Sequence, residues 1–174
     1  MRVWTSDPVG FSELMADVMG GRDPLPKTMA VRLRSLLNHP AIEMAHLNQP
    51  KSGGYERTCL FACPDGRFSV WGIVWSPQSA TPIHSHHCWC VVGLVQGQIV
   101  EVGYEPVSEC QARRVWERVY KPGMTQALCP DQPNIHRMEN RTGVPALSIH
   151  VYGFDPRLRP TSIERCFHEA VTRH

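Results

Sequence analysis

The feature that most constrains this chain is a series of short apolar segments, separated by turn residues, that begins after Gly53-Gly54. The segments are rich in β-branched and aromatic residues, and Pro, Gly or Asp recurs in the connections between them. Many short strands with frequent turns are typical of a β-sandwich or a closed barrel. We therefore expect a mainly β fold, with strands at residues 55–62, 68–75, 89–95, 98–104, 115–120, 126–129 and 146–152.

Residues 1–50 have a different pattern, in which apolar residues recur at helical spacing. A first helix is expected to end at Gly20-Gly21, a second to cover residues 27–38, and a short third to cover residues 40–47. Two or three N-terminal helices would then precede the strands and pack on the sheet. The stripe that predicts the first helix consists of Phe11, Leu14, Met15, Val18 and Met19.

A length of 174 residues suits one domain with a core of its own. Within residues 1–174 we expect a helical part at 1–50, a β-barrel at 51–156 and a C-terminal tail at 157–174. The sequence contains no internal repeat, linker or low-complexity segment that would divide this domain.

The composition is that of an ordinary globular protein, with 42% apolar and 20% charged residues. The 18 Lys and Arg residues nearly balance the 16 Asp and Glu residues, and no basic cluster marks a nucleic-acid surface. No stretch approaches the ~18 apolar residues of a membrane span, and the first residues lack the apolar segment of a signal peptide. We therefore expect a cytoplasmic monomer or weak homo-oligomer, without nucleic-acid or membrane partners, whose seven Cys residues stay reduced.

Five of the nine His residues gather in the strand-rich part of the chain. His84 and His86 are two residues apart in an extended segment, so both imidazoles lie on one face of a strand and can bind one metal ion. A lone His-x-His pair is more often two exposed polar residues. Here a strongly apolar segment follows the pair, and His136 lies between two further strand-like segments, which favours a metal site.

The segment 146–152 alternates polar and apolar residues, so that Ser148, His150 and Tyr152 share one face of a strand. Two interpretations remain open at this point. In the first, the polar face simply lies in water, as in many half-buried strands. In the second, it lines a cavity, where the hydroxyl, imidazole and phenol groups form a hydrogen-bonded chain.

These motifs resemble those of the cupin superfamily and, within it, the cysteine dioxygenase family. The first cupin motif is H-x-H, three or four residues, an acidic residue, six residues and Gly. Here His84-Ser85-His86 is followed at that spacing by Cys90 and Gly97, so that Cys replaces the acid. The second motif, H-x3-N, is matched by His136 and Asn140. Thiol dioxygenases also lack the acid and use three neutral His ligands.

Three further segments extend the resemblance over about residues 10–155. The segment 136–140, His-Arg-Met-Glu-Asn, resembles the H-R-V-E-N segment of the family. The triplet of Ser148, His150 and Tyr152 resembles its Ser-His-Tyr relay. Tyr55-x-Arg57 lies where the family carries a Tyr and the Arg that binds the substrate carboxylate.

The resemblance implies a single cupin (small jelly-roll) β-barrel that holds one Fe(II) through His84, His86 and His136. It implies a thiol dioxygenase, which uses O2 to oxidise a small thiol carboxylate to its sulfinate. Tyr152, His150 and Ser148 would form the catalytic relay, while Arg57 and Tyr55 would bind the substrate.

Arg57 favours an amino-acid thiol such as L-cysteine, because relatives that act on 3-mercaptopropionate carry Gln at this position. Turnover of 3-mercaptopropionate or mercaptosuccinate, or a non-catalytic cupin that binds a small molecule, are the alternatives. Other small cupin enzymes, isomerases or decarboxylases with manganese or zinc, usually keep the acid that is absent here.

Animal members of the family have a Cys that is cross-linked to the relay Tyr. Cys90 and Tyr152 are therefore candidates for a thioether cross-link. The segment between the His pair and Gly97 is one residue shorter than in animal members, and Cys88 is a neighbouring candidate. Two buried thiols without a cross-link are the alternative.

Overall fold

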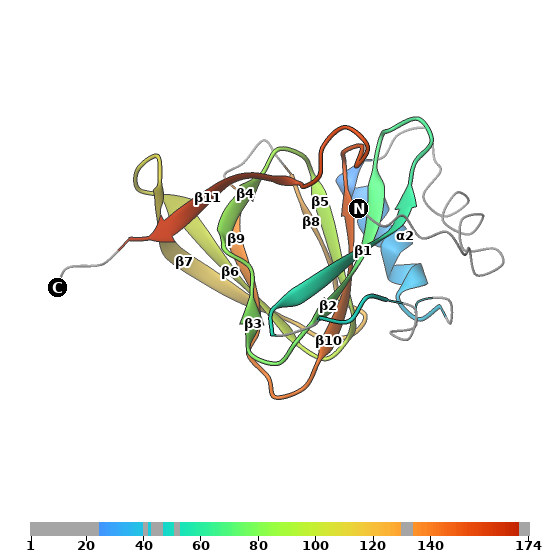
Figure 1. Cartoon of the computed structure of the whole chain (residues 1–174), viewed down its shortest axis with the longest axis horizontal. Coiled ribbons are helices and arrows are strands. Elements are labelled where there is room, and N and C mark those ends of the chain that lie inside the picture. The colour runs from blue at the N-terminus through green and yellow to red at the C-terminus, as the bar shows by residue number, and fades with distance from the viewer. Residues whose placement is uncertain (1–24, 40–41, 43–46, 51–52, 130–133, 171–174) are drawn as a thin grey trace.

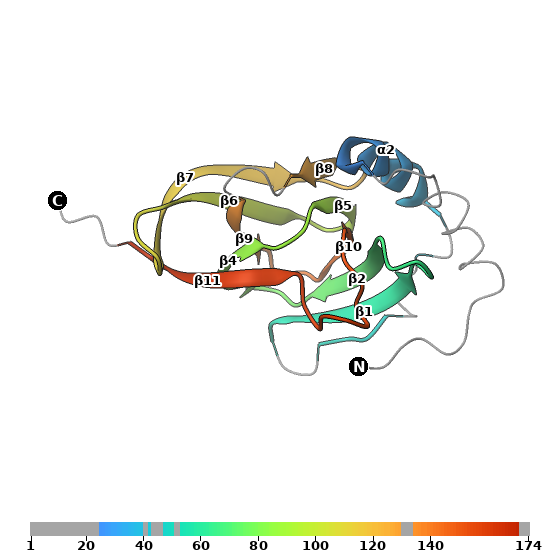
Figure 2. The ribbon, with the colours of Figure 1, turned by 90° about the horizontal axis from the view of Figure 1, so that it is seen from above.

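The computed structural model describes residues 25–39, 42, 47–50, 53–129 and 134–170, which contain eleven strands and one helix. The strands form two sheets that face each other (Figures 1 and 2). In the five-stranded sheet the order is β1 (Tyr55–Ala62), β2 (Ser69–Trp75), β10 (Ala146–Tyr152), β5 (Cys90–Gln96) and β8 (Thr125–Leu128). In the six-stranded sheet it is β3 (Ser79–Ala80), β9 (Ile135–Asn140), β4 (Ile83–His86), β11 (Ile163–Glu169), β7 (Gln111–Tyr120) and β6 (Ile99–Pro106).

The six-stranded sheet closes on itself, because β6 pairs with β9 as well as with β7. Closure removes the unpaired edges that an open sheet would expose. An apolar cluster that includes Ile83, Val102, Ala112, Ile135 and Phe167 is contributed by strands of this ring. The opposite face of the ring is turned toward the five-stranded sheet.

The helix α2 (Pro26–Leu36) packs on the outer face of the five-stranded sheet, next to β5 and β8 (Figure 1). Pro26 fits the first turn of the helix, where a backbone N–H has no partner inside the helix. Met29, Leu33 and Leu36 lie three or four residues apart and are fully or almost fully buried. They pack against apolar side chains of β2, β5 and β10.

Strand β10 is buried along its whole length because the sheet is covered on both faces. Leu147, Ile149 and Val151 belong to the outer cluster under α2. Ser148 and His150 point the other way, into the space between the two sheets, where they form hydrogen bonds. The polar face of this strand is therefore not in water, which decides between the two interpretations that the sequence left open.

The N-terminal helices are reproduced only in part. The second expected helix, 27–38, corresponds to α2 at Pro26–Leu36. The first expected helix lies outside the described residues. Most of the third, at 40–47, also lies outside them, and its two described residues, Ile42 and Leu47, are not helical. The described part of the chain thus holds one helix rather than two or three, and none that is long and apolar enough to span a membrane.

The expectation of a tail at 157–174 is wrong for residues Ile163–Glu169, which form β11. This strand pairs antiparallel with β4 and, at its end, parallel with β7. Most of its side chains are exposed or half-buried, so it is held by backbone hydrogen bonds rather than by a core-facing apolar pattern. Its position beside β4 brings Ser162 and Ile163, at the start of this strand, next to the candidate site.

Candidate metal centre

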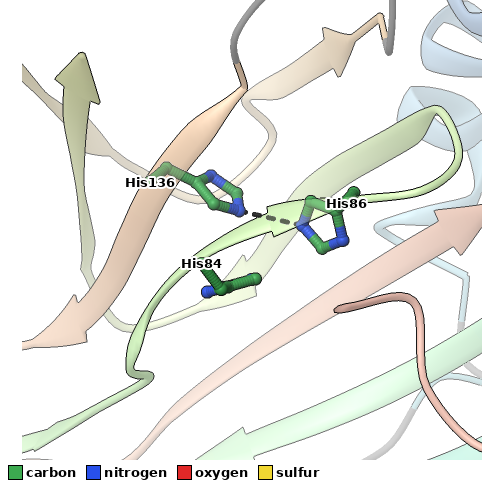
Figure 3. A group of neighbouring side chains, drawn as sticks. All are labelled: His84, His86 and His136. Carbon is green, nitrogen blue, oxygen red and sulfur yellow. Dashed lines mark hydrogen bonds between the residues drawn. The ribbon is translucent and has the colours of Figure 1, made fainter. Parts of the chain in front are cut away.

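Three His side chains from two adjacent strands converge between the sheets (Figure 3). His84 and His86 lie on β4, and His136 lies on β9 directly opposite His84 in the strand register. All three are buried, and each offers one ring nitrogen within 4.8 Å of the other two. This is the geometry of a mononuclear site with three imidazole ligands.

The backbone fixes which nitrogen of the two β4 histidines faces the site. The Nδ1 of His84 lies 2.9 Å from the carbonyl oxygen of Pro82, and the Nδ1 of His86 lies 3.2 Å from that of Ser162. A carbonyl oxygen only accepts, so each Nδ1 must carry the proton and donate it. Each Nε2 is then left with a lone pair, which is the form of imidazole that binds a metal.

His136 has the same arrangement with a stronger acceptor, because its Nδ1 lies 2.7 Å from Oε1 of Glu101. The Nε2 atoms of His136 and His86 are 2.9 Å apart, as the dashed line in Figure 3 marks. If both Nδ1 atoms carry the protons, two lone pairs face each other at this distance. A cation between them relieves that repulsion, so these residues fit a metal ion.

The environment keeps His84 and His86 neutral. Burial, followed by the neighbouring His136, lowers the pKa of His84 to about 3. Burial also lowers the pKa of His86 well below its usual value, and His136 and His84 add to this effect. Neutral imidazoles are ready to bind a metal near pH 7 without first losing a proton.

Glu101 on β6 is a site residue that the sequence analysis missed. Its side chain is completely buried, and its Oε2 accepts a hydrogen bond of 2.7 Å from the Tyr120 hydroxyl. Burial by itself would raise the pKa of Glu101, but the hydrogen bonds from His136 and Tyr120 and the nearby charges hold it below its usual value. The signal was present in the sequence, since Glu101 is the one charged residue in the otherwise apolar segment 99–104.

Ser148, His150 and Tyr152 on β10 form a hydrogen-bonded chain, and Trp75 extends it. The indole Nε1–H of Trp75 donates to Ser148 Oγ at 2.8 Å, and Ser148 Oγ lies 2.9 Å from Nε2 of His150. Nδ1 of His150 lies 3.1 Å from the Tyr152 hydroxyl. Burial, followed by the neighbouring His136, lowers the pKa of His150 to about 3, so this imidazole is neutral.

Trp75 gives the chain a direction, because an indole N–H can only donate. Ser148 accepts that bond, and among the described residues the only acceptor for its own hydrogen is Nε2 of His150. His150 then carries its proton on Nδ1 and donates it to the oxygen of Tyr152. The hydroxyl proton of Tyr152 is left to be donated elsewhere.

Tyr152 lies beside the metal site and opposite Cys90. Its ring centroid is 5.6 Å from that of His86, and it lines the same cavity as the three histidines. Burial raises the pKa of Tyr152 well above its usual range, so the phenol stays protonated and can donate. Cys90 is its direct partner across β5 and β10, and both side chains belong to one buried cluster with Cys88.

Arg57 and Tyr55, from β1, line the cavity in front of the histidines. The guanidinium of Arg57 lies over the ring of Trp71, 5.3 Å from its centroid. In the described part of the chain no hydrogen bond or ion pair engages this guanidinium. Arg57 also lines an outer cavity of about 420 Å³, so it stands between that cavity and the metal site. Tyr55 packs against Trp75, with ring centroids 5.1 Å apart.

Almost every residue that the sequence singled out is therefore in one place. His87 lies apart from the ligand group, as its position on the other strand face implied, and its Nε2 lies 3.0 Å from the Thr161 carbonyl oxygen. Ser162, from the segment expected as a tail, lines the cavity and provides the carbonyl oxygen that orients His86. Sequence reasoning had no local signal for this contact, because 76 residues separate the two positions.

Together, the closed barrel and the buried histidines are those of a cupin, or double-stranded β-helix, protein with three histidines that could hold a metal ion. Solved structures agree on the fold. An uncharacterised protein with a double-stranded β-helix domain from Klebsiella pneumoniae aligns with a TM-score of 0.51 and 15% identity, over 66% of this chain and 89% of that one. The protein TT1209 from Thermus thermophilus aligns with a TM-score of 0.50 and 20% identity, over 64% of this chain and 94% of that one.

The family follows from the sequence itself. The sequence model of cysteine dioxygenase type I matches residues 37–160, which is most of the chain. The chain belongs to the cysteine dioxygenase type I family.

Proposed function

We propose that this protein is an Fe(II)- and O2-dependent thiol dioxygenase that oxidises a small thiol carboxylate, with L-cysteine as the favoured substrate, to its sulfinate. The observation that carries the proposal is the triad of buried histidines, each with one ring nitrogen within 4.8 Å of the other two, and Arg57 at the same cavity. The reaction balances without a further reductant, because both atoms of O2 go to the sulfur of one thiol.

His84, His86 and His136 would hold the iron, and imidazole is a suitable ligand type for it. When bound, Fe(II) would supply a positive centre that favours the thiolate form of the substrate and allows the thiol and O2 to meet. Three protein ligands leave further coordination positions for the reactants. The protein's own side chains provide the remaining functions.

Arg57 would bind the substrate carboxylate. A guanidinium forms two parallel hydrogen bonds to a carboxylate, which Lys cannot reproduce, and Arg57 has no competing acidic partner among the described residues. Tyr55 would complete this end of the pocket. The ring of Trp71 under the guanidinium restricts its movement, so that the charge is held ready at the cavity.

The relay would control one proton beside the sulfur. In the direction that Trp75 imposes, Tyr152 keeps its hydroxyl proton for donation into the cavity, while Ser148 and His150 hold its oxygen in place. This supports a role in orienting the reactants rather than in binding metal. A thioether between Cys90 and Tyr152 would lock the phenol further, and their cross-strand pairing supports such a bond.

The test is anaerobic reconstitution with Fe(II), followed by O2 consumption with L-cysteine, 3-mercaptopropionate, cysteamine and mercaptosuccinate, and detection of the sulfinate. One O2 consumed per sulfinate formed from L-cysteine supports the proposal. Preference for another carboxylate thiol would keep the chemistry and change the substrate. Absence of O2 uptake with every thiol, despite bound iron, would refute the enzyme and favour a binding protein.

A further inference from the structure

Glu101 is the most unusual charged group in the described structure, because a carboxylate with no exposed surface is rare unless it is paired. Its Oε1 lies 2.7 Å from Nδ1 of His136, and its Oε2 accepts a hydrogen bond of 2.7 Å from the Tyr120 hydroxyl. Arg118 is more distant, with 3.9 Å between Nη1 and Oε2, and its side chain is 40% exposed. Both carboxylate oxygens are therefore engaged, while the ion pair with Arg118 is a loose one.

A metal ion on the other side of His136 would place a positive charge one imidazole ring away from this carboxylate. His136 has one nitrogen toward Glu101 and the other toward the point that the three histidines share. An imidazole in this position polarises when its outer N–H donates to a carboxylate, and it becomes a stronger donor to the metal. The carboxylate thereby acts on the ion through one intervening ring.

The position of this charge matters because Cys90 stands where the cupin motif has an acidic residue. Burial, followed by the neighbouring Cys88 and Glu101, raises the pKa of Cys90 well above its usual value, so it stays a neutral thiol. The cavity that holds the histidines is lined by Arg57 and not by Glu101. The negative charge is therefore behind His136, out of the way of an anionic ligand.

We propose that Glu101 is a positioning residue that orients His136 for the metal and supplies, through that imidazole, the negative charge that the cupin acid would otherwise give. The inference rests on the metal site of the proposed function. It concerns how tightly the site binds metal and how far it favours the more highly charged oxidation state. Neither quantity requires that the protein oxidise a thiol.

Glu101→Gln is the decisive variant, since the amide keeps the volume and can still accept from His136 through its carbonyl oxygen. The Tyr120 hydroxyl can turn to accept from the amide N–H, so both hydrogen bonds survive and only the charge is lost. Glu105→Gln is the matched control, because it removes an exposed carboxylate from the same strand. Glu101→Leu removes the charge and the hydrogen bonds together.

Metal affinity would be measured by competition with a chelator, and the midpoint potential of the bound Fe(III)/Fe(II) couple by spectroscopic titration. We expect Glu101→Gln to bind Fe(II) about tenfold more weakly and Glu101→Leu up to about 100-fold more weakly, as for other partners of metal-bound histidines. The charge favours Fe(III) over Fe(II), and a tenfold loss of that preference raises the potential by about 59 mV. The Glu105→Gln control should leave both quantities unchanged.

Tyr120→Phe gives an independent test, because it should shift the midpoint potential in the direction opposite to that of Glu101→Gln. Without the phenol, more of the carboxylate charge is available to His136, so the midpoint potential should fall below that of the wild type. A merely structural role of the Glu101–Tyr120 pair predicts no ordered shift of this kind.

The proposal is overturned if Glu101→Gln matches Glu105→Gln in both metal affinity and potential, whatever Glu101→Leu does, because the carboxylate would then be only a polar support. If the iron-loaded wild type oxidises no thiol while these shifts appear, the proposed function fails and the role of Glu101 stands.

Discussion

Replacing Ser148 with Ala should destabilise the barrel far more than the loss of one hydroxyl group from a surface would. Ser148 is fully buried and connects two other buried polar groups, the Trp75 indole N–H and Nε2 of His150. Neither group has another partner among the described hydrogen bonds. The substitution therefore leaves a donor and an acceptor unpaired in the interior.

The magnitude follows from counting those two groups. Each buried polar group without a partner costs about 1–3 kcal/mol, so Ser148→Ala should lower the free energy of unfolding by about 2–6 kcal/mol. That is a large part of the roughly 5–15 kcal/mol by which ordinary domains are stable. Ser35→Ala, on the exposed face of α2, should change the stability by less than about 0.5 kcal/mol.

A double-mutant cycle separates this effect from simple loss of packing. In a Trp75→Phe background the indole N–H is already absent. Ser148→Ala then leaves only one buried polar group, Nε2 of His150, without a hydrogen-bond partner. The Ser148→Ala step should then cost about 1–3 kcal/mol less than it does in the wild type, which is the coupling energy of the cycle.

Urea unfolding followed by far-ultraviolet circular dichroism, with a chelator present, gives the four free energies without a contribution from bound metal. Equal m-values would show that the denatured states are comparable. Additive free energies, or a Ser148→Ala variant as stable as Ser35→Ala, would refute the hydrogen-bonded chain and its direction.

Four further predictions concern the site. Arg57→Lys should raise KM for L-cysteine by about 10- to 100-fold, since it removes charged hydrogen bonds of about 1.5–3 kcal/mol, and should leave the iron content unchanged; equal loss of iron would contradict the assignment. The pKa of His150 is about 3 in the folded state against 6.5 normally, so at intermediate pH the unfolded chain binds a proton that the folded chain does not. The free energy of unfolding of the metal-free protein should therefore fall as the pH falls from about 6.5 toward 3. In acid titrations His150→Gln should make this dependence of stability on pH less steep. Chelation should lower the melting temperature of the iron-loaded wild type and not that of His86→Ala, whereas equal shifts would argue against the ligand set. Turnover with Fe(II), thiol and O2 should form the thioether between Cys90 and Tyr152, so that mass spectrometry finds the two peptides joined, with a mass two hydrogens below their sum. Cys90→Ser should abolish this change.

The parts of the structure that the sequence predicted depend on local patterns. The strands expected at residues 55–62 and 146–152 coincide with β1 and β10, because apolar and β-branched residues between turn signals mark each segment on its own. The His84 and His86 pair is likewise local. The place of His136 between strand-like segments made it a candidate third ligand, and the family resemblance supported this. The spacing of 50 residues between His86 and His136 does not by itself show that the two segments are adjacent.

The features that the sequence analysis missed depend on partners far along the chain. Glu101 can be buried only because Tyr120 and His136, 19 and 35 residues away, provide its hydrogen bonds. Strand β11 has exposed or half-buried side chains throughout and joins the sheet through its backbone, so it lacks the alternation that identifies a strand. Both features become visible only once the barrel has closed.

The distribution of charge across the site explains why an acid among the metal ligands would be unfavourable for the proposed reaction. A thiol carboxylate approaches the metal with a carboxylate and a developing thiolate, and an acidic side chain in the same cavity would repel both. In this structure the cavity has Arg57 on the substrate side, whereas Glu101 lies behind His136. The carboxylate can thus strengthen the histidine as a ligand, while the imidazole ring separates its charge from the substrate. Moving an acid from Glu101 to position 90, as a Glu101→Gln and Cys90→Glu double variant, should therefore keep metal binding. It should weaken the binding of thiol carboxylates more than that of cysteamine, which has an amine and no carboxylate.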